Sequence, residues 1–238
     1  MSVLIYGKNP CKEILLSEKP IIKAYLEKDQ NSDLHSILTK KSTDITMLSK
    51  ADFNLRFTGN HQGIVIEVAE YHLLTLDEAT KKHEKLKNPT YLMLDGITDP
   101  HNLGAIIRSA EAGGITAIIL PKNRSVGITG TVAKVSSGAL EYMDLIEVVN
   151  LSQTIDKLKK IGFWIVGTEM NAPKKYTEID VTTPLCIIIG SEGKGISRLL
   201  KEKSDYLISI PMVGHVNSLN ASVSAGIVIF EILKQKGL

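Results

Sequence analysis

The stretch YLMLDGITDPHNLGAIIRSAEAGGI (91–115) decides the fold, because it passes from an apolar run through a polar turn into a helical segment. An unbroken apolar run is typical of a strand buried on both faces of a parallel sheet. The strand is expected to end at Asp95 and the helix to begin near Asn102, a residue type that caps helix N-termini. The stretch therefore predicts one strand–helix unit, with polar residues after the strand.

The same alternation continues in both directions along the chain. Short apolar runs rich in Val and Ile alternate with helix-like segments, which predicts an α/β fold with parallel sheets and crossover helices. We expect the remaining strands at VLIY (3–6), PIIKAY (20–25), DITML (44–48), GIVIEV (63–68), AIIL (117–120), LIEVV (145–149), FWIVGTE (163–169), LCIIIGSE (185–192) and YLISIP (206–211).

The length and a polar central segment predict two domains. A chain of 238 residues exceeds the usual size of a single domain. Residues 75–90 are polar, contain helix formers and end at Asn88-Pro89, so they are expected to form a linker or a linking helix. We therefore expect a smaller domain at 1–74 and a larger α/β domain at 91–238.

Composition excludes several classes of protein but does not indicate a partner. The formal net charge is only +2, so a strongly basic nucleic-acid-binding surface does not follow from charge. The chain lacks an apolar run of membrane-spanning length and an export signal. Cys11 and Cys186 are far apart and have no neighbours at metal-ligand spacing, so we expect no disulfide, no metal and a cytoplasmic location.

Ligands of open α/β sheets bind beyond the carboxyl ends of strands, and three loops of the larger domain follow strands. In the first loop, 95–115, Arg108 lies in the apolar stretch AIIRSA and requires an anionic partner. A phosphate group of a ligand would be one such anionic partner. By itself the loop favours a structural ion pair with Asp95, Asp99 or Glu111.

The second loop, IIIGSEGKGIS (187–197), contains glycines at 190, 193 and 195. Glycines permit positive φ and allow backbone N–H groups to approach a ligand, and Glu192 can accept hydrogen bonds. A dinucleotide-binding turn is the rival interpretation, but Arg198 stands where its third glycine would be.

The third loop, ISIPMVGHVNSLNASVSAGIVIFEI (208–232), leads from a strand into the last helix. Asn217, Ser218 and Asn220 are all capping types, which is more than one helix needs. The small residues that follow indicate close packing against backbone or a ligand.

Together these loops resemble the SpoU family, also called the TrmH family, of RNA 2′-O-ribose methyltransferases. NLGAIIRSAEAGG, IIIGSEGKGIS and IPMVGHVNSLNASVSAGI resemble the three family motifs, in order. RSVGITGTVAKVSSGALEY (124–142) extends the similarity, and IYGKNPCKEIL and NHQGIVIEVAEY resemble the RNA-binding domain of the branch that modifies guanosine in 23S ribosomal RNA.

The resemblance implies a knotted methyltransferase domain that acts as a homodimer. Its C-terminal segment would form a deep trefoil knot, which periodicity alone could not suggest because knots are rare. S-adenosylmethionine would be the methyl donor, held mainly by main-chain groups, and no metal is implied. The carried-over donor-binding positions are Gly190, Ile210, Met212, Ser218 and Leu219.

The resemblance also implies the catalytic residues and the substrate. Arg108 would stabilise the developing ribose alkoxide and bind the adjacent phosphate, while Asn102, Glu192, Ser218 and Asn220 would orient the reacting groups. The expected substrate is a guanosine of 23S ribosomal RNA. A transfer-RNA target, a uridine target, an antibiotic self-protection role, a nicotinamide-dependent oxidoreductase and a non-catalytic RNA-binding protein remain as alternatives.

Overall fold

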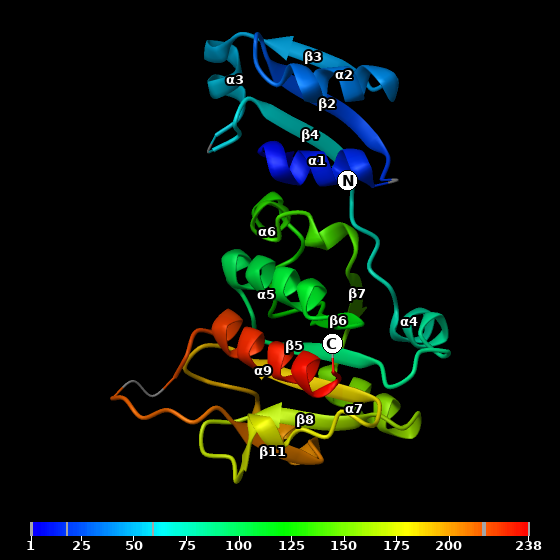
Figure 1. Ribbon diagram of the computed structural model, residues 1–238, viewed down its shortest axis with the longest axis vertical. Helices are drawn as coiled ribbons and strands as arrows, with labels where there is room; N and C mark the ends of the chain where they lie inside the picture. Colours follow the sequence, from blue (N-terminus) through cyan, green and yellow to red (C-terminus); the bar gives the residue numbers. More distant parts are fainter. Residues whose placement is uncertain (1, 18, 59, 216–217, 238) are drawn as a thin grey trace. The chain divides into compact units, whose positions relative to one another are not determined.

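The computed structural model describes residues 2–17, 19–58, 60–215 and 218–237. The chain divides into two compact units (Figure 1): the first unit comprises Met1–Tyr71 and Ile128–Tyr142, and the second comprises His72–Gly127 and Met143–Leu238. Within the described residues, no helix combines the length and the apolar character needed to cross a membrane. Each unit has its own sheet.

The first unit is built on a four-stranded sheet in the order β1-β4-β2-β3. The strands are β1 Ser2–Tyr6, β2 Ile21–Glu27, β3 Ile45–Leu48 and β4 Ile64–Ala69, close to the predicted runs. β4 is antiparallel to both β1 and β2, whereas β2 and β3 are parallel. The expectation of a parallel sheet is therefore wrong for this unit, because an apolar run does not encode the direction of its neighbour.

Helices pack against this sheet, and apolar side chains are buried on both of its faces. They are α1 Lys8–Leu16, α2 Ser32–Lys40, α3 Lys50–Arg56 and α6 Gly130–Val135, with a 3₁₀ turn at Ala139–Glu141. On α3, Phe53 packs with Phe57, Tyr25 and Val65, with ring centroids of Phe53 and Phe57 5.1 Å apart. The alternate residues Ile64 and Ile66 are also fully buried, so both faces of β4 are covered.

The second unit contains the predicted parallel sheet. Its seven strands have the order β7-β6-β5-β10-β8-β11-β9, and every neighbouring pair is parallel. The strands are β5 Thr90–Asp95, β6 Ala117–Pro121, β7 Asp144–Val148, β8 Trp164–Thr168, β9 Lys174–Lys175, β10 Leu185–Gly190 and β11 Tyr206–Ser209. The α/β class is thereby confirmed. The two-residue strand β9 was not predicted.

Helices lie on both faces of this sheet and make it the middle of three layers. One core contains Tyr91 and Met93 together with apolar residues of α4 Leu76–Lys82, α7 Leu151–Lys160 and α8 Arg198–Lys203. The other face is covered by α5 Pro100–Ala112 and α9 Ala221–Gln235, which pack against each other. Leu92 and Leu94 alternate with Tyr91 and Met93 and are equally buried, which explains the continuous apolar run.

Two helix starts differ in how well the sequence located them. α9 begins at Ala221, directly after Asn220, one of the three capping residues noted in the third loop. α5 begins at Pro100 rather than near Asn102, because the side chain of Asp99 accepts a hydrogen bond from the His101 N–H at 2.9 Å. Proline has a preset φ and no N–H to satisfy, so it suits the first helical position. Asn102 therefore lies inside the first turn.

The last part of the chain returns across the sheet. β11 lies beside β8, yet α9 packs against α5 and β10. The chain therefore leaves β11 on one side of β8 and enters α9 on the other side, beside β10. A return of this kind is needed for the predicted trefoil knot, in which the last helix follows a path through a loop of the preceding chain.

Candidate functional site

The three loops singled out from the sequence meet at the carboxyl edge of the seven-stranded sheet. The first two follow β5 and β10, which are neighbours, and the third follows β11, one strand beyond β8. Because the strands are parallel, their carboxyl ends lie at the same edge. Residues separated by more than 100 positions in sequence are thereby brought into contact.

Asn102, Glu192 and Asn220 form a hydrogen-bonded cluster, one residue from each loop. The Asn102 Nδ2 donates to Glu192 Oε1 at 3.1 Å, and the Asn220 Nδ2 donates to Asn102 Oδ1 at 2.9 Å. The Asn220 Nδ2 also donates to Glu192 Oε1. The carboxylate of Glu192 thus accepts from both amides, and we call these three residues the amide–carboxylate cluster.

Asn220 also caps α9. Its Oδ1 accepts hydrogen bonds from the backbone N–H of Ser222 at 2.9 Å and of Val223 at 3.3 Å. The orientation of this amide is therefore fixed by the helix end, which leaves the Nδ2 to face Asn102 and Glu192. Of the other two capping types, Ser218 does not cap α9, and Asn217 lies outside the described residues.

The glycine-rich loop folds back tightly onto the end of β10. The Gly195 N–H donates to the Ser191 carbonyl at 2.9 Å, and the Ser197 N–H donates to Asp95 Oδ2 at 2.7 Å. A Cβ on Gly190 would overlap backbone atoms of Gly195 and Ile196. Only glycine permits this close approach, because the obstructing atoms belong to the backbone.

A cavity of about 440 Å³ opens beside this loop. A volume of this size lies within the range of small-molecule sites. Its walls come from the ends of β8, β10 and β11 and from the start of α9. All five positions carried over for donor binding line it: Gly190, Ile210, Met212, Ser218 and Leu219.

Part of the cavity wall comes from residues that none of the sequence motifs indicated. Thr168 ends β8, Glu169 and Met170 follow it, Lys194 lies in the glycine-rich loop, and Ser224 lies in the first turns of α9. FWIVGTE was predicted as a strand, so the rule that ligands bind beyond the carboxyl ends of strands could have identified Glu169. Its neighbours carry no motif, and only the tertiary fold shows that β8 lies between β10 and β11.

Arg108 does not line the cavity. It is exposed on α5, six residues after Asn102. Asp95 accepts a hydrogen bond from the Ser197 N–H, and Asp99 caps α5.

The described part of the chain contains no group of three or more His, Cys, Asp or Glu residues placed to hold a metal ion. His101 is exposed in the first turn of α5. In the first unit, His61 lies within 2.9 Å of Asn54 Oδ1 and accepts from the Gly63 N–H at 3.1 Å, so its ring organises a turn. Burial raises the pKa of the Cys11 and Cys186 thiols, which disfavours a role as nucleophiles.

Comparison with known families agrees with this geometry. The model of the SpoU rRNA Methylase family matches residues 89–230, and a model described as RNA 2′-O ribose methyltransferase substrate binding matches residues 4–74. The chain belongs to the SpoU/TrmH family of RNA methyltransferases. The family prediction made from the three motifs is confirmed.

Relatives and solved structures extend this assignment over the whole chain. The Bacillus subtilis protein YacO, assigned to the TrmH family of tRNA/rRNA methyltransferases, is 41% identical over 237 residues, covering 98% of this chain and 95% of YacO. The SpoU methyltransferase AviRb from Streptomyces viridochromogenes, solved with AdoMet, superimposes with a TM-score of 0.85 at 23% identity, covering 99% and 90% of the two chains. The TrmH/SpoU tRNA-modifying enzyme of A. aeolicus gives 0.57 at 26% identity and covers 67% of this chain and 84% of its own.

Proposed function

We propose that this protein transfers the methyl group of S-adenosylmethionine to a ribose 2′-hydroxyl of RNA, with a guanosine of 23S ribosomal RNA as its target. The observation that carries the proposal is the cavity beside the amide–carboxylate cluster, at the carboxyl edge of the sheet. Methyl transfer needs a donor and a hydroxyl held next to each other, and the two adjoining features supply a place for each.

The cavity has the chemistry needed for the donor. Ile189, Ile208 and Leu219 line the cavity with apolar residues that suit an adenine ring. Gly190 at the end of β10 and Ile210 just after β11 line the same space and can offer main-chain groups. Donor binding through such groups is typical of small-molecule sites with few distinctive side chains. When bound, S-adenosylmethionine supplies a methyl group already activated by a sulfonium.

The protein residues would then position and activate the hydroxyl. Arg108 binds the RNA phosphate next to the target and stabilises the negative charge that develops on the ribose oxygen. Asn102, Glu192 and Asn220 hold the loops in register, since each hydrogen bond of their cluster joins two loops. Ser218, at the cavity wall, orients the ribose. No metal takes part in this scheme.

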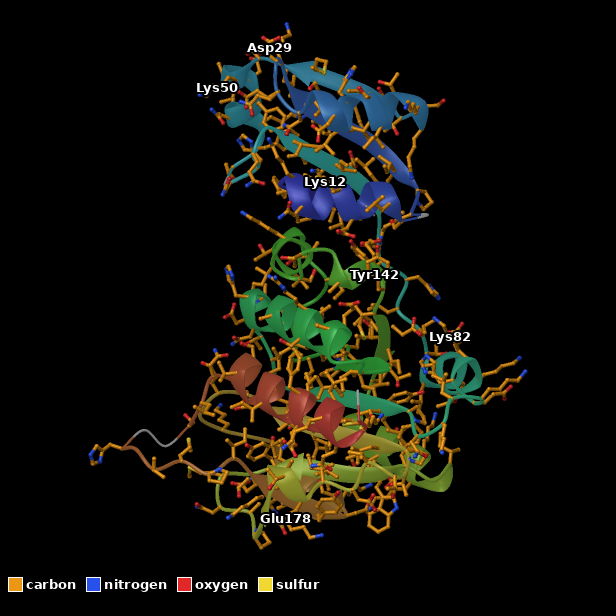
Figure 2. All side chains as sticks on the ribbon, viewed as in Figure 1. Lys12, Asp29, Lys50, Lys82, Tyr142 and Glu178 are labelled. Carbon is orange, nitrogen blue, oxygen red and sulfur yellow. The ribbon has the colours of Figure 1, made fainter. Side chains whose placement is uncertain are left out.

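The first unit would choose the target RNA. Asp29 follows β2, and Lys50 begins α3 just after β3; because β2 and β3 are parallel, both residues lie at one end of the sheet (Figure 2). Lys28 and Gln62 lie in loops at the same end, because β4 is antiparallel to β2. Polar and basic loops of this kind suit contacts with the phosphates and shape of folded RNA.

Coverage of the relatives favours ribosomal RNA over transfer RNA. An rRNA methyltransferase from Sinorhizobium meliloti matches 98% of this chain, whereas the A. aeolicus tRNA-modifying enzyme matches 67% of it. The additional residues match the substrate-binding model at 4–74. We also propose a homodimer in the cytoplasm, with the exposed apolar side chains of Val223 and Phe230 on α9 as part of its interface.

Labelled methyl transfer from S-adenosylmethionine to total RNA tests the proposal, with RNA from cells that lack the protein and nuclease mapping of the product. Wild type should label a 2′-O-methylated guanosine of 23S ribosomal RNA. Arg108→Ala should lower the rate by about 100- to 1000-fold, the usual effect of removing one electrostatic stabiliser. Arg198→Ala, a matched loss of an exposed arginine paired with Glu202 on α8, should retain activity.

Three outcomes would contradict parts of the proposal. Label in transfer RNA would keep the reaction and overturn the target. Label on a base, or on ribose of another nucleotide, would overturn the guanosine 2′-hydroxyl. Donor binding without transfer to free RNA or to assembling large subunits would favour the non-catalytic RNA-binding alternative.

A further inference from the structure

Glu169 is an acidic residue in the wall of the cavity, which is also lined by residues of β10 and β11. It directly follows β8, and its backbone N–H donates to the Ile208 carbonyl at 2.8 Å, which anchors the residue to β11. None of the three motif loops contains Glu169. A carboxylate is an acceptor only, so its presence in a binding cavity selects for ligand groups that donate hydrogen bonds.

The charge of this carboxylate is already balanced. Lys201 on α8 forms an ion pair with Glu169 Oε2, an atom that has no solvent-accessible surface. The Glu169 side chain as a whole is 26% exposed, so its exposed part excludes Oε2. Lys201 therefore holds one carboxylate oxygen of a residue that lines the cavity.

Resting on the proposed function, we propose that Glu169 recognises the methyl donor by accepting hydrogen bonds from the vicinal hydroxyls of its ribose. The other carboxylate oxygen, Oε1, has two lone pairs and can accept from both neighbouring hydroxyls. An acidic residue has this role in dinucleotide-binding folds. The donor's ammonium group is the other candidate, but the nearby Lys201 cation offsets the attraction of Glu169 for a second cation. Hydroxyl groups carry no charge and do not suffer this repulsion.

The placement of Glu169 also suits this role. Glu169 stands at the end of β8, between β10 and β11, and lines the same cavity as the apolar residues Ile189 and Leu219, which would hold the adenine. Lys201 limits the movement of the carboxylate, which reduces the entropy lost when the hydroxyls bind. The donor would thus be selected as a ribonucleoside, not a deoxyribonucleoside.

Titration calorimetry on the full chain can test this with three probes: S-adenosylhomocysteine, its 2′-deoxy analogue and 5′-methylthioadenosine. Wild type should bind the 2′-deoxy analogue more weakly than S-adenosylhomocysteine. Glu169→Ala should weaken binding of S-adenosylhomocysteine and 5′-methylthioadenosine by about 10- to 100-fold each, the usual effect of losing hydrogen bonds to a charged group. Glu169→Gln should restore part of the affinity.

Glu202→Ala is the matched control, because Glu202 pairs with Arg198 on the exposed side of α8 and does not line the cavity. A penalty with S-adenosylhomocysteine that disappears with 5′-methylthioadenosine would assign Glu169 to the ammonium group and overturn the proposal. Equal binding of the 2′-deoxy analogue by wild type would overturn it without any variant. Failure of wild type to bind any of the three probes would instead reject the donor site itself.

Discussion

Replacing Gly190 by alanine should abolish donor binding while leaving most of the fold intact. The added Cβ overlaps backbone atoms of Gly195 and Ile196, so no side-chain rotation can relieve the clash. To restore an ordinary carbon contact of about 3.5 Å, the glycine-rich loop must retreat by roughly 1.5 Å. A displacement near 1 Å at a binding site can cost about 100-fold in activity.

The expected loss of stability is smaller than the loss of binding. Overpacking of this kind costs about 1–3 kcal/mol, which for a chain of this size lowers Tm by roughly 2–4 °C per kcal/mol. Thermal unfolding would measure that cost, and titration with S-adenosylhomocysteine would measure binding. The Ser197 N–H to Asp95 hydrogen bond should also weaken, since it joins the displaced loop to β5.

Gly214→Ala is the matched control for this experiment. Gly214 lies in the loop between β11 and α9, and a Cβ there would meet no atom within 4 Å. It should therefore change Tm by little and leave binding unaltered. If Gly190→Ala binds S-adenosylhomocysteine as tightly as wild type, the argument that this close backbone approach shapes the cavity is refuted.

Three further predictions concern residues inside and outside the site. Asn220→Ala should destabilise the protein by about 1 kcal/mol through loss of the α9 cap, and it should also lower the rate of methyl transfer. Asn220→Asp should keep the cap but lose the amide donor. Urea unfolding measures the first effect, and the transfer assay measures the second. Burial lowers the pKa of Lys19 to about 8, so its charged form is disfavoured in the folded state. The free energy of unfolding of wild type should therefore rise with pH between about 8 and 10.5. Lys19→Met should remove that rise in urea titrations at several pH values, and an equal rise in the variant would contradict the prediction. Iodoacetamide at pH 8 should modify neither Cys11 nor Cys186 in the native protein, because both thiols are buried and burial raises their pKa. Both should react in urea. Rapid labelling of the native protein, detected by mass spectrometry, would disprove their burial.

Local sequence was sufficient for the elements of the fold and for the family. Continuous apolar runs such as LCIII identified the central strands, because a strand covered on both faces has no polar side to show. The three motifs named the residues that the structure brings together, including Asn102, Glu192 and Asn220. The start of α5 was misplaced by two residues because Asp99, and not Asn102, satisfies the first free N–H groups.

Tertiary structure decided everything that depends on which strands are neighbours. Strand direction in the first unit was mispredicted, since hydrogen-bond partners of β4 are set by distant segments and not by its own sequence. Glu169 has no motif around it, and it becomes a site residue only because β8 lies between β10 and β11. The sequence by itself determined which side chains are available for chemistry, and the order of the strands determined which of them can act on one ligand.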